Sequence, residues 1–283
     1  MRGTGETWLI YNGASGSHDQ QTLQNLAAAL DAAGHAPARV VDCKDGTPDA
    51  AEANAAGLGL IVVHGGDGTL SRTIGGLEGF GGAVLPLPGG TFNLLAREMF
   101  GDRDALTIVD LFRERRLASV RRSCIRGEGL LALAELLAGP GAKWADVREE
   151  LRGSNIGEVI AKGWDAASTS AVGPMVAVVR PAGGRADGYA GVRLCPRPDG
   201  MTIDGYAAEG LGDYVQQGIA ILKRDFREGP HDKIGAARSV ECRSLAGAPI
   251  PLMVDGERSE GASALSFSLD TLDCDLLGLP DGR

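Results

Sequence analysis

A glycine-rich loop, Gly65-Gly-Asp-Gly-Thr69, holds the residues of this 283-residue chain that are best suited to chemistry. It follows an apolar run and precedes a helical pattern. Glycines between a strand and a helix direct backbone N–H groups outward at the positive end of a helix dipole, where a phosphate binds. Because they lack Cβ atoms, Gly65, Gly66 and Gly68 would let the backbone lie close to that phosphate.

The two polar side chains of this loop extend the prediction. A carboxylate beside a phosphate is repelled unless a cation lies between them, so Asp67 is the candidate ligand for Mg²⁺, directly or through water. Thr69 could donate its hydroxyl to a phosphate or cap the following helix. Taken alone, the loop is equally well explained as a tight turn with Asp67 as the helix N-cap.

Two further loops, Asn12-Gly-Ala-Ser-Gly16 and Gly89-Gly-Thr-Phe-Asn93, follow other apolar runs in the same way. The carboxyl ends of parallel strands meet at one edge of a sheet, so three such loops predict one ligand crevice. With residues 65–69, the candidate nucleotide-binding residues are Asn12, Ser15, Gly16, Gly89, Gly90, Thr91 and Asn93.

The elements that would position these loops form an α/β pattern, which we expect to make one domain over residues 1–120. Continuous apolar runs fit parallel strands that are covered on both faces. Amphipathic helical spacing follows the loops, as in the doubly wound folds. The expected strands are 7–12, 38–43, 58–63 and 83–87, and one expected helix is 94–100.

Beyond residue 120 the pattern changes to short strands with polar turns. This indicates a β-rich, sandwich-like second domain over residues 121–283. The expected strands are 174–180, 191–195, 239–244, 250–254 and 264–269, and the expected helices are 129–138, 141–152 and 212–224.

The loops resemble those of the diacylglycerol kinase catalytic-domain family, which includes bacterial lipid kinases and the sphingosine and ceramide kinases. The family's Gly-Gly-Asp-Gly-Thr signature is unchanged at residues 65–69. Its Asn-Pro-x-Ser-Gly loop is matched at residues 12–16, with Gly13 in place of Pro. The other matches are Pro88, Gly90, Thr91, Asn93, Ala96 and Arg97 in the third loop, and Val254-Asp-Gly-Glu257 near the C-terminus.

The chain departs from the family pattern at two positions near these motifs. Arg72 stands where the family usually has Glu, and Leu94 where it commonly has Asp. The loss of a carboxylate at Arg72 points to altered metal or nucleotide contacts. Residues 150–245 match no motif of the family, so the lipid specificity is not carried over.

The resemblance implies an ATP-dependent transfer of the γ-phosphate to a lipid hydroxyl, such as that of diacylglycerol, with ATP and Mg²⁺ as cofactors. Such a step needs held phosphates, a cation to offset charge and a carboxylate that takes the hydroxyl proton. Glu257, or less favourably Asp255, is the family-matched candidate for that base. The alternative is that Asp255-Gly256 is a hairpin turn between strands.

Two other functions stay open. NAD kinases share the fold and the Gly-Gly-Asp-Gly-Thr loop, but their downstream Asn-Glu pair and Thr-Pro-Thr-Gly-Ser-Thr-like segment are not found here. A nucleotide-binding regulator that has lost catalysis is the third alternative, which Arg72 and the unmatched middle segment keep open.

Charge and hydropathy limit the partners. A net charge of −9 argues against nucleic acid, which needs a clustered cationic face. No run approaches the roughly 20 apolar residues of a membrane-spanning helix, so we expect a cytoplasmic protein with transient membrane-surface contact. A homodimer is compatible with the sequence. One arginine cluster is either a solvated helix end with a following strand or a patch for anionic headgroups: Arg113, Arg115, Arg116, Arg121, Arg122 and Arg126.

Overall fold

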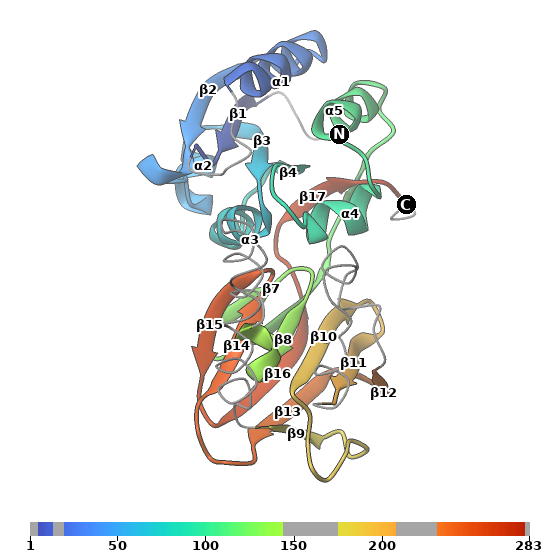
Figure 1. Ribbon diagram of the computed structural model, residues 1–283. Helices are drawn as coiled ribbons and strands as arrows, with labels where there is room; N and C mark the ends of the chain where they lie inside the picture. Colours follow the sequence, from blue (N-terminus) through green and yellow to red (C-terminus); the bar gives the residue numbers. More distant parts are fainter. Residues whose placement is uncertain (1–4, 14–19, 144–174, 208–230, 281–283) are drawn as a thin grey trace, which may run out of the picture. The chain divides into compact units, whose positions relative to one another are not determined.

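The computed structural model describes residues 5–13, 20–143, 175–207 and 231–280. The chain divides into two compact units, Met1–Cys124 with Asp270–Arg283, and Ile125–Leu269 (Figure 1). The expected division at residue 120 did not include the return of the C-terminal segment to the first unit. That return occurs because strand β17 (Asp275–Gly278) pairs with two strands of the first unit's sheet.

The first unit is built on a six-stranded sheet in the order β2-β1-β3-β4-β17-β5. All its pairings are parallel except that of β17 with β5, so the expected α/β class is confirmed. Besides β17, the strands are β1 (Glu6–Tyr11), β2 (Pro37–Asp42), β3 (Leu58–Gly65), β4 (Ala83–Pro88) and β5 (Ala118–Val120).

Burial along these strands follows their place in the sheet. Ile61, Val62 and Val63 in the central strand β3 are fully buried, as a continuous apolar run predicts. Strand β2 lies at the edge, and its Val40 is 48% exposed. Because β1 lies between β2 and β3, the chain reverses its direction of winding between β1 and β3. Ligands of open α/β sheets bind at this point, beyond the carboxyl ends of the strands.

Helices connect the strands of the first unit. Helix α1 packs against α5, and α3 against α4. Asp49 caps α2, which was not predicted, and Asp104 caps α5, both through their carboxylates. No helix among the described residues is long and apolar enough to cross a membrane. The helices are α1 (Gln20–Ala32), α2 (Ala50–Ala55), α3 (Asp67–Gly76), α4 (Leu94–Phe100) and α5 (Ala105–Arg113), with a 3-10 turn η1 at Cys43–Asp45.

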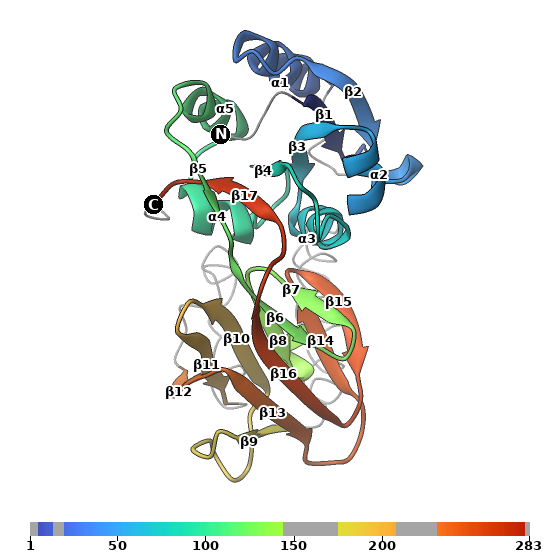
Figure 2. The ribbon, with the colours of Figure 1, turned by 180° about the vertical axis from the view of Figure 1, so that it is seen from behind.

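The second unit is a sandwich of two sheets (Figure 2), which confirms the expected β-rich architecture. The six-stranded sheet has the order β12-β11-β10-β8-β14-β15, and the five-stranded sheet β7-β6-β16-β13-β9. The first sheet contains β12 (Asp232–Ala237), β11 (Gly200–Tyr206), β10 (Gly191–Arg197), β8 (Leu136–Ala138), β14 (Ile250–Val254) and β15 (Glu257–Gly261). The second contains β7 (Leu130–Ala132), β6 (Ser123–Gly127), β16 (Ala264–Thr271), β13 (Ser239–Ser244) and β9 (Val176–Arg180).

Both sheets contribute to one apolar core. Leu194 and Leu252 of the first sheet lie in the same buried cluster as Val240 and Phe267 of the second. In strand β16 buried and exposed positions alternate, as expected for a strand with one face on this core.

The expected helix at 129–138 is wrong. Those residues form strands β7 and β8, joined by the segment 133–135. The apolar run has no period that separates a helix from a buried strand, and a distant carboxylate binds the N–H groups of 133–135, as described below. Of the expected helix 141–152, only the 3-10 turn η2 (Pro140–Lys143) lies within the described residues, and the expected helix 212–224 lies outside them.

Candidate functional site

The first two loops meet at the point where the sheet reverses its winding. The Asn12 amide Nδ2, directly after β1, donates to the Thr69 hydroxyl Oγ1 on α3 at 3.0 Å. Thr69 thus binds a neighbouring loop, which neither of its two expected roles included. Ser15 and Gly16 of the first loop lie outside the described residues.

Asp67 joins the second loop to the third. It is the first residue of α3, whose N-cap is Gly66, so the expected N-cap role of Asp67 is wrong. The residue is 7% exposed, and its carboxylate accepts the Leu95 backbone N–H at 3.2 Å. Asp67 therefore caps helix α4, and one carboxylate spans the two loops.

The glycines of the second and third loops let these loops touch each other. The Gly89 N–H donates to the Gly65 carbonyl at 2.9 Å. A Cβ on Gly90 would lie 2.5 Å from the Gly66 Cα, so no larger residue fits there without moving the backbone. We expected these glycines to admit a phosphate, and the structure gives them a second task, the close packing of one loop on the other.

Asn93 fixes the shape of the third loop. Its Oδ1 accepts the Gly90 N–H at 2.8 Å, and its Nδ2 donates to the Gly90 carbonyl at 2.9 Å. Its φ of 51° lies in the left-handed region, which Asn tolerates better than most residues. Asn93 is therefore occupied within the loop, whereas Thr91 is exposed at its tip.

The two departures from the family pattern both lie on these helices. Leu94 is the first residue of α4. Arg72 lies three residues after Thr69 on α3, hence on the same side of the helix, and is exposed. Burial and the negative charge of Asp42 raise the pKa of the Cys43 thiol above its usual value. The positive charge of the Arg72 guanidinium offsets part of this rise. The Arg72 side chain thus lies toward the end of β2.

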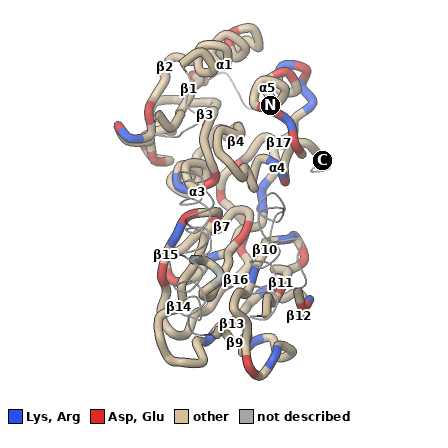
Figure 3. The backbone as a smooth tube through the Cα atoms, viewed as in Figure 1, with Lys and Arg blue, Asp and Glu red and all other residues tan. Residues whose placement is uncertain are grey.

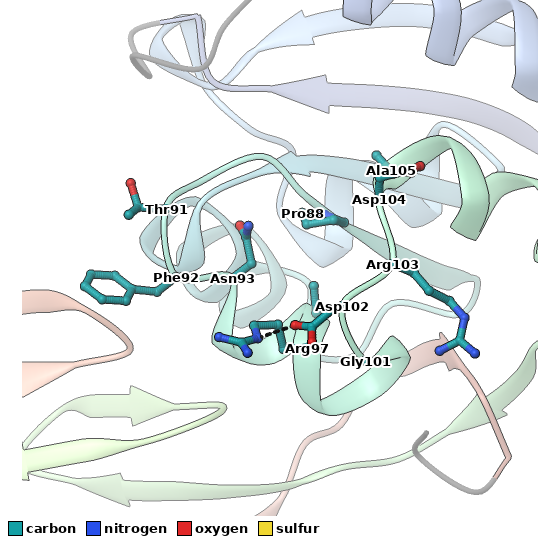
Figure 4. Close-up of a pocket in the computed structure, with 11 residues that line it drawn as sticks. Pro88, Thr91, Phe92, Asn93, Arg97, Gly101, Asp102, Arg103, Asp104 and Ala105 are labelled. Carbon is teal, nitrogen blue, oxygen red and sulfur yellow. Dashed lines mark ion pairs between the residues drawn. The ribbon is translucent and has the colours of Figure 1, made fainter. Parts of the chain in front are cut away.

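A pocket of about 500 Å³ opens beside the third loop (Figure 4). The Arg97 Nε lies 2.8 Å from the Asp102 Oδ1 in this pocket, so the family-matched Arg97 is paired with an acid. The lining residues are Pro88, Thr91, Phe92, Asn93, Ala96, Arg97, Gly101, Asp102, Arg103, Asp104 and Ala105.

In the second unit, Asp255 and Gly256 form the hairpin turn that was the alternative to a catalytic role. Both have positive φ, 46° and 84°, and they join β14 directly to β15. This is the backbone of a two-residue turn of the type that favours Asp-Gly. Val254 and Glu257 pair across it.

Asp255 also holds a distant segment. Its carboxylate, in a residue that is 1% exposed, accepts the backbone N–H groups of Leu133, Ala134 and Glu135 at 2.7, 2.8 and 2.9 Å. Glu257, in contrast, is exposed at the start of the edge strand β15. Of the two candidate bases, only Glu257 presents its carboxylate to solvent.

Two further acidic residues escaped the sequence reasoning. Asp42, at the carboxyl end of β2, accepts the Gly13 N–H of the first loop at 3.3 Å. The sequence signal for Asp42 was an acidic residue near the end of the expected strand 38–43, at the edge of the sheet where the loops were expected. Glu135 is 3% exposed and binds the Arg193 Nε at 3.0 Å, but the misassigned helix at 129–138 hid it.

The arginine cluster is largely neutralised by acids, as the mixed colours near α5 indicate (Figure 3). Helix α5 ends at Arg113 and β5 follows, which matches the solvated helix end rather than a cationic patch. The ion pairs are Arg113–Asp110, Arg116–Glu114, Arg121–Asp273, Arg121–Asp275 and Arg122–Glu98.

Comparison with known proteins agrees with the resemblance of the loop motifs. The family model of the diacylglycerol kinase catalytic domain matches residues 6–122. A diacylglycerol kinase from Bacillus anthracis str. Sterne has the same fold, with a TM-score of 0.63, 15% identity and coverage of 99% of this chain and 98% of its own.

Two further proteins of that strain, provisionally assigned as diacylglycerol kinases, give TM-scores of 0.66 and 0.64. Their identities are 17% and 18%, over 99% of this chain and 97% and 99% of theirs. No curated protein sequence matches the chain.

Proposed function

Because residues 6–122 belong to the diacylglycerol kinase catalytic-domain family, we propose that the protein is an ATP-dependent lipid kinase. It transfers the γ-phosphate of ATP to a lipid hydroxyl, such as that of diacylglycerol. The observation that carries the proposal is the mutual locking of the loops that follow β1, β3 and β4, through Asn12–Thr69, Gly65–Gly89 and Asp67–Leu95.

These loops are suited to hold the triphosphate of ATP. Gly66, Asp67 and Gly68 lie at the N-terminus of the ten-residue helix α3, where N–H groups and the helix dipole favour an anion. The exposed hydroxyl of Thr91 is a further donor at the tip of the third loop. Because the loops are tied to one another, the phosphates meet a preformed surface.

These loops suit a Mg²⁺ ion whose ligands come from both the protein and the nucleotide. The described residues contain no group of three or more His, Cys, Asp or Glu side chains that could hold a metal by themselves. Mg²⁺ is usually held by one or two carboxylates together with phosphates and water, so the single carboxylate of Asp67 is sufficient. When bound, the ion offsets the negative charge that develops on the transferred phosphoryl group.

Glu257 is the proposed base for the lipid hydroxyl. Its exposed carboxylate is available to accept a proton. Asp255, which is bound to three backbone N–H groups, is proposed to hold the hairpin that carries Glu257. Glu257 would take the hydroxyl proton as the oxygen attacks the γ-phosphorus and ADP leaves.

The test is a transfer assay with purified protein, Mg²⁺ and ATP labelled on the γ-phosphate. The acceptors are diacylglycerol, sphingosine, ceramide and NAD in separate reactions. Label in an organic-extractable product is the expected outcome. Label in NADP would replace the proposal with an NAD kinase, and ATP binding without any transfer would replace it with a regulator.

A further inference from the structure

The first loop lacks the residue that would stiffen it. The family has Pro where this chain has Gly13, and the proline ring fixes φ near −65°. Glycine has the greatest conformational freedom of all residues and loses the most on ordering. With glycine in place of proline at position 13, a nucleotide-binding loop needs another contact that restricts its backbone.

The carboxylate of Asp42 supplies a restraint of that kind. Asp42 is 6% exposed at the end of β2. Its Oδ1 accepts the Gly13 N–H at 3.3 Å and the Lys44 N–H at 3.2 Å, while its Oδ2 lies 2.9 Å from the Lys44 Nζ. A proline at position 13 would have no N–H for this bond, so the contact requires a residue other than proline there.

Space at Gly13 points to the same dependence. A Cβ on Gly13 would lie 2.3 Å from the Asp42 Oδ2, well inside van der Waals contact. The same oxygen lies 2.9 Å from the Lys44 Nζ, so withdrawal of the carboxylate from a Cβ would disturb this ion pair. Residues 13 and 42 therefore form a matched pair, in which the acid occupies the volume that a side chain at 13 would need.

The charge of Asp42 suits this role. Burial acts to raise the pKa of the carboxyl group, but the bonds from Lys44 and from the Gly13 N–H hold that pKa below its usual value. The group is thus a charged acceptor at neutral pH, and hydrogen bonds to charged groups are stronger than neutral ones.

We propose that Asp42 is a positioning residue for nucleotide binding, which holds Gly13, and through it Asn12, against Thr69. This inference rests on the proposed function. The linkage runs from β2 through Asp42 and Gly13 to Asn12, and from Asn12 to Thr69 on α3. It replaces the stiffness of a proline with a hydrogen bond to a buried acid.

A mutant cycle tests the pairing of the two residues. The variants are Asp42→Ala, Gly13→Ala and the double variant, with Asp42→Asn as the conservative change and the exposed Asp45→Ala as the control from the same 3-10 turn. The dissociation constant of Mg²⁺ with a non-hydrolysable ATP analogue is measured by calorimetry. Amide exchange at residue 13 is followed by NMR, and thermal unfolding reports on the fold.

Asp42→Ala should raise the dissociation constant about tenfold, the usual weight of a hydrogen bond to a charged group. Asn keeps an acceptor, so Asp42→Asn should raise it less, and Asp45→Ala should not change it. Gly13→Ala should be at least as harmful as Asp42→Ala, yet the double variant should be no worse than Asp42→Ala, because the clash is gone. Wild-type affinity in Asp42→Ala, or effects that multiply in the double variant, would overturn the inference.

The inference and the proposed function fail in different ways. If the wild-type protein binds no ATP analogue, the proposed function is overturned. Amide exchange at Gly13 then tests separately whether Asp42 restrains Gly13. Faster exchange at Gly13 in Asp42→Ala than in Asp45→Ala supports the restraint, and equal exchange rates contradict it.

Discussion

In the first unit the candidate residues lie in loops that bind one another, whereas in the second unit a buried aspartate holds a hairpin and an exposed glutamate stands beside it. Asp67 and Asp42 are both buried and both accept backbone N–H groups of a neighbouring segment. Asp255 does the same with three N–H groups. Only Glu257 among these acids is exposed.

The comparison separates buried carboxylates, which hold the backbone in place, from an exposed carboxylate, which is accessible to a substrate. A buried carboxylate saturated with N–H donors stabilises a loop geometry, and its loss leaves unsatisfied donors. Asp67 is the special case, because its position at the start of α3 beside two glycines also suits a metal–phosphate contact. Substitutions that keep or remove the acceptor oxygen can distinguish the two roles.

The largest expected effect comes from Asp67→Asn. Asn retains an oxygen for the Leu95 N–H, so the fold should persist, but the charge that we propose to hold Mg²⁺ is lost. We expect phosphoryl transfer to fall by about a thousandfold, since a catalytic metal contributes several kcal/mol. Steady-state assays with circular dichroism check both parts, and the exposed Asp31→Asn serves as the control. Near-normal turnover would remove Asp67 from the metal site.

Asp255→Ala should mainly reduce stability. Three buried N–H groups would lose their acceptor, at a cost of about 3 kcal/mol in the free energy of unfolding. Urea denaturation measures this, with Glu257→Ala as the matched exposed control, for which we expect no loss. An Asp255→Ala protein of unchanged stability but without activity would instead make Asp255 the base.

Glu257→Gln should reduce kcat about a hundredfold and leave the KM for ATP nearly unchanged, as expected for a general base. Glu260→Gln on the same strand β15 is the control and should behave like the wild type. A variant in which only nucleotide affinity falls would identify Glu257 as a binding residue and require another base.

The smallest effect is expected at Asn93. Asn93→Ala removes both bonds to Gly90 and places alanine, which tolerates a positive φ less well than asparagine, at this position; the change should cost about 2 kcal/mol of stability. Asn93→Gly tolerates that φ and should cost less. Thermal unfolding compares the two, and equal losses would show that the backbone conformation does not matter.

Sequence patterns correctly predicted the parts of the structure that depend on interactions between residues close in sequence. The strand–glycine–helix units around Gly65 and Gly89 and the Asp255-Gly256 turn follow from short-range sequence. The segment 129–138 failed because its fold depends on a carboxylate more than 100 residues away. Asp42 was missed for the same reason, since its partner Gly13 lies on another strand end.

The stoichiometry of the reaction tests the central claim most directly. ADP and phosphorylated lipid are quantified in parallel over time with purified protein, Mg²⁺, ATP and diacylglycerol in mixed micelles. The account predicts one lipid phosphate for each ADP formed, and neither product above background with Asp67→Asn. ADP released without lipid phosphate would contradict it.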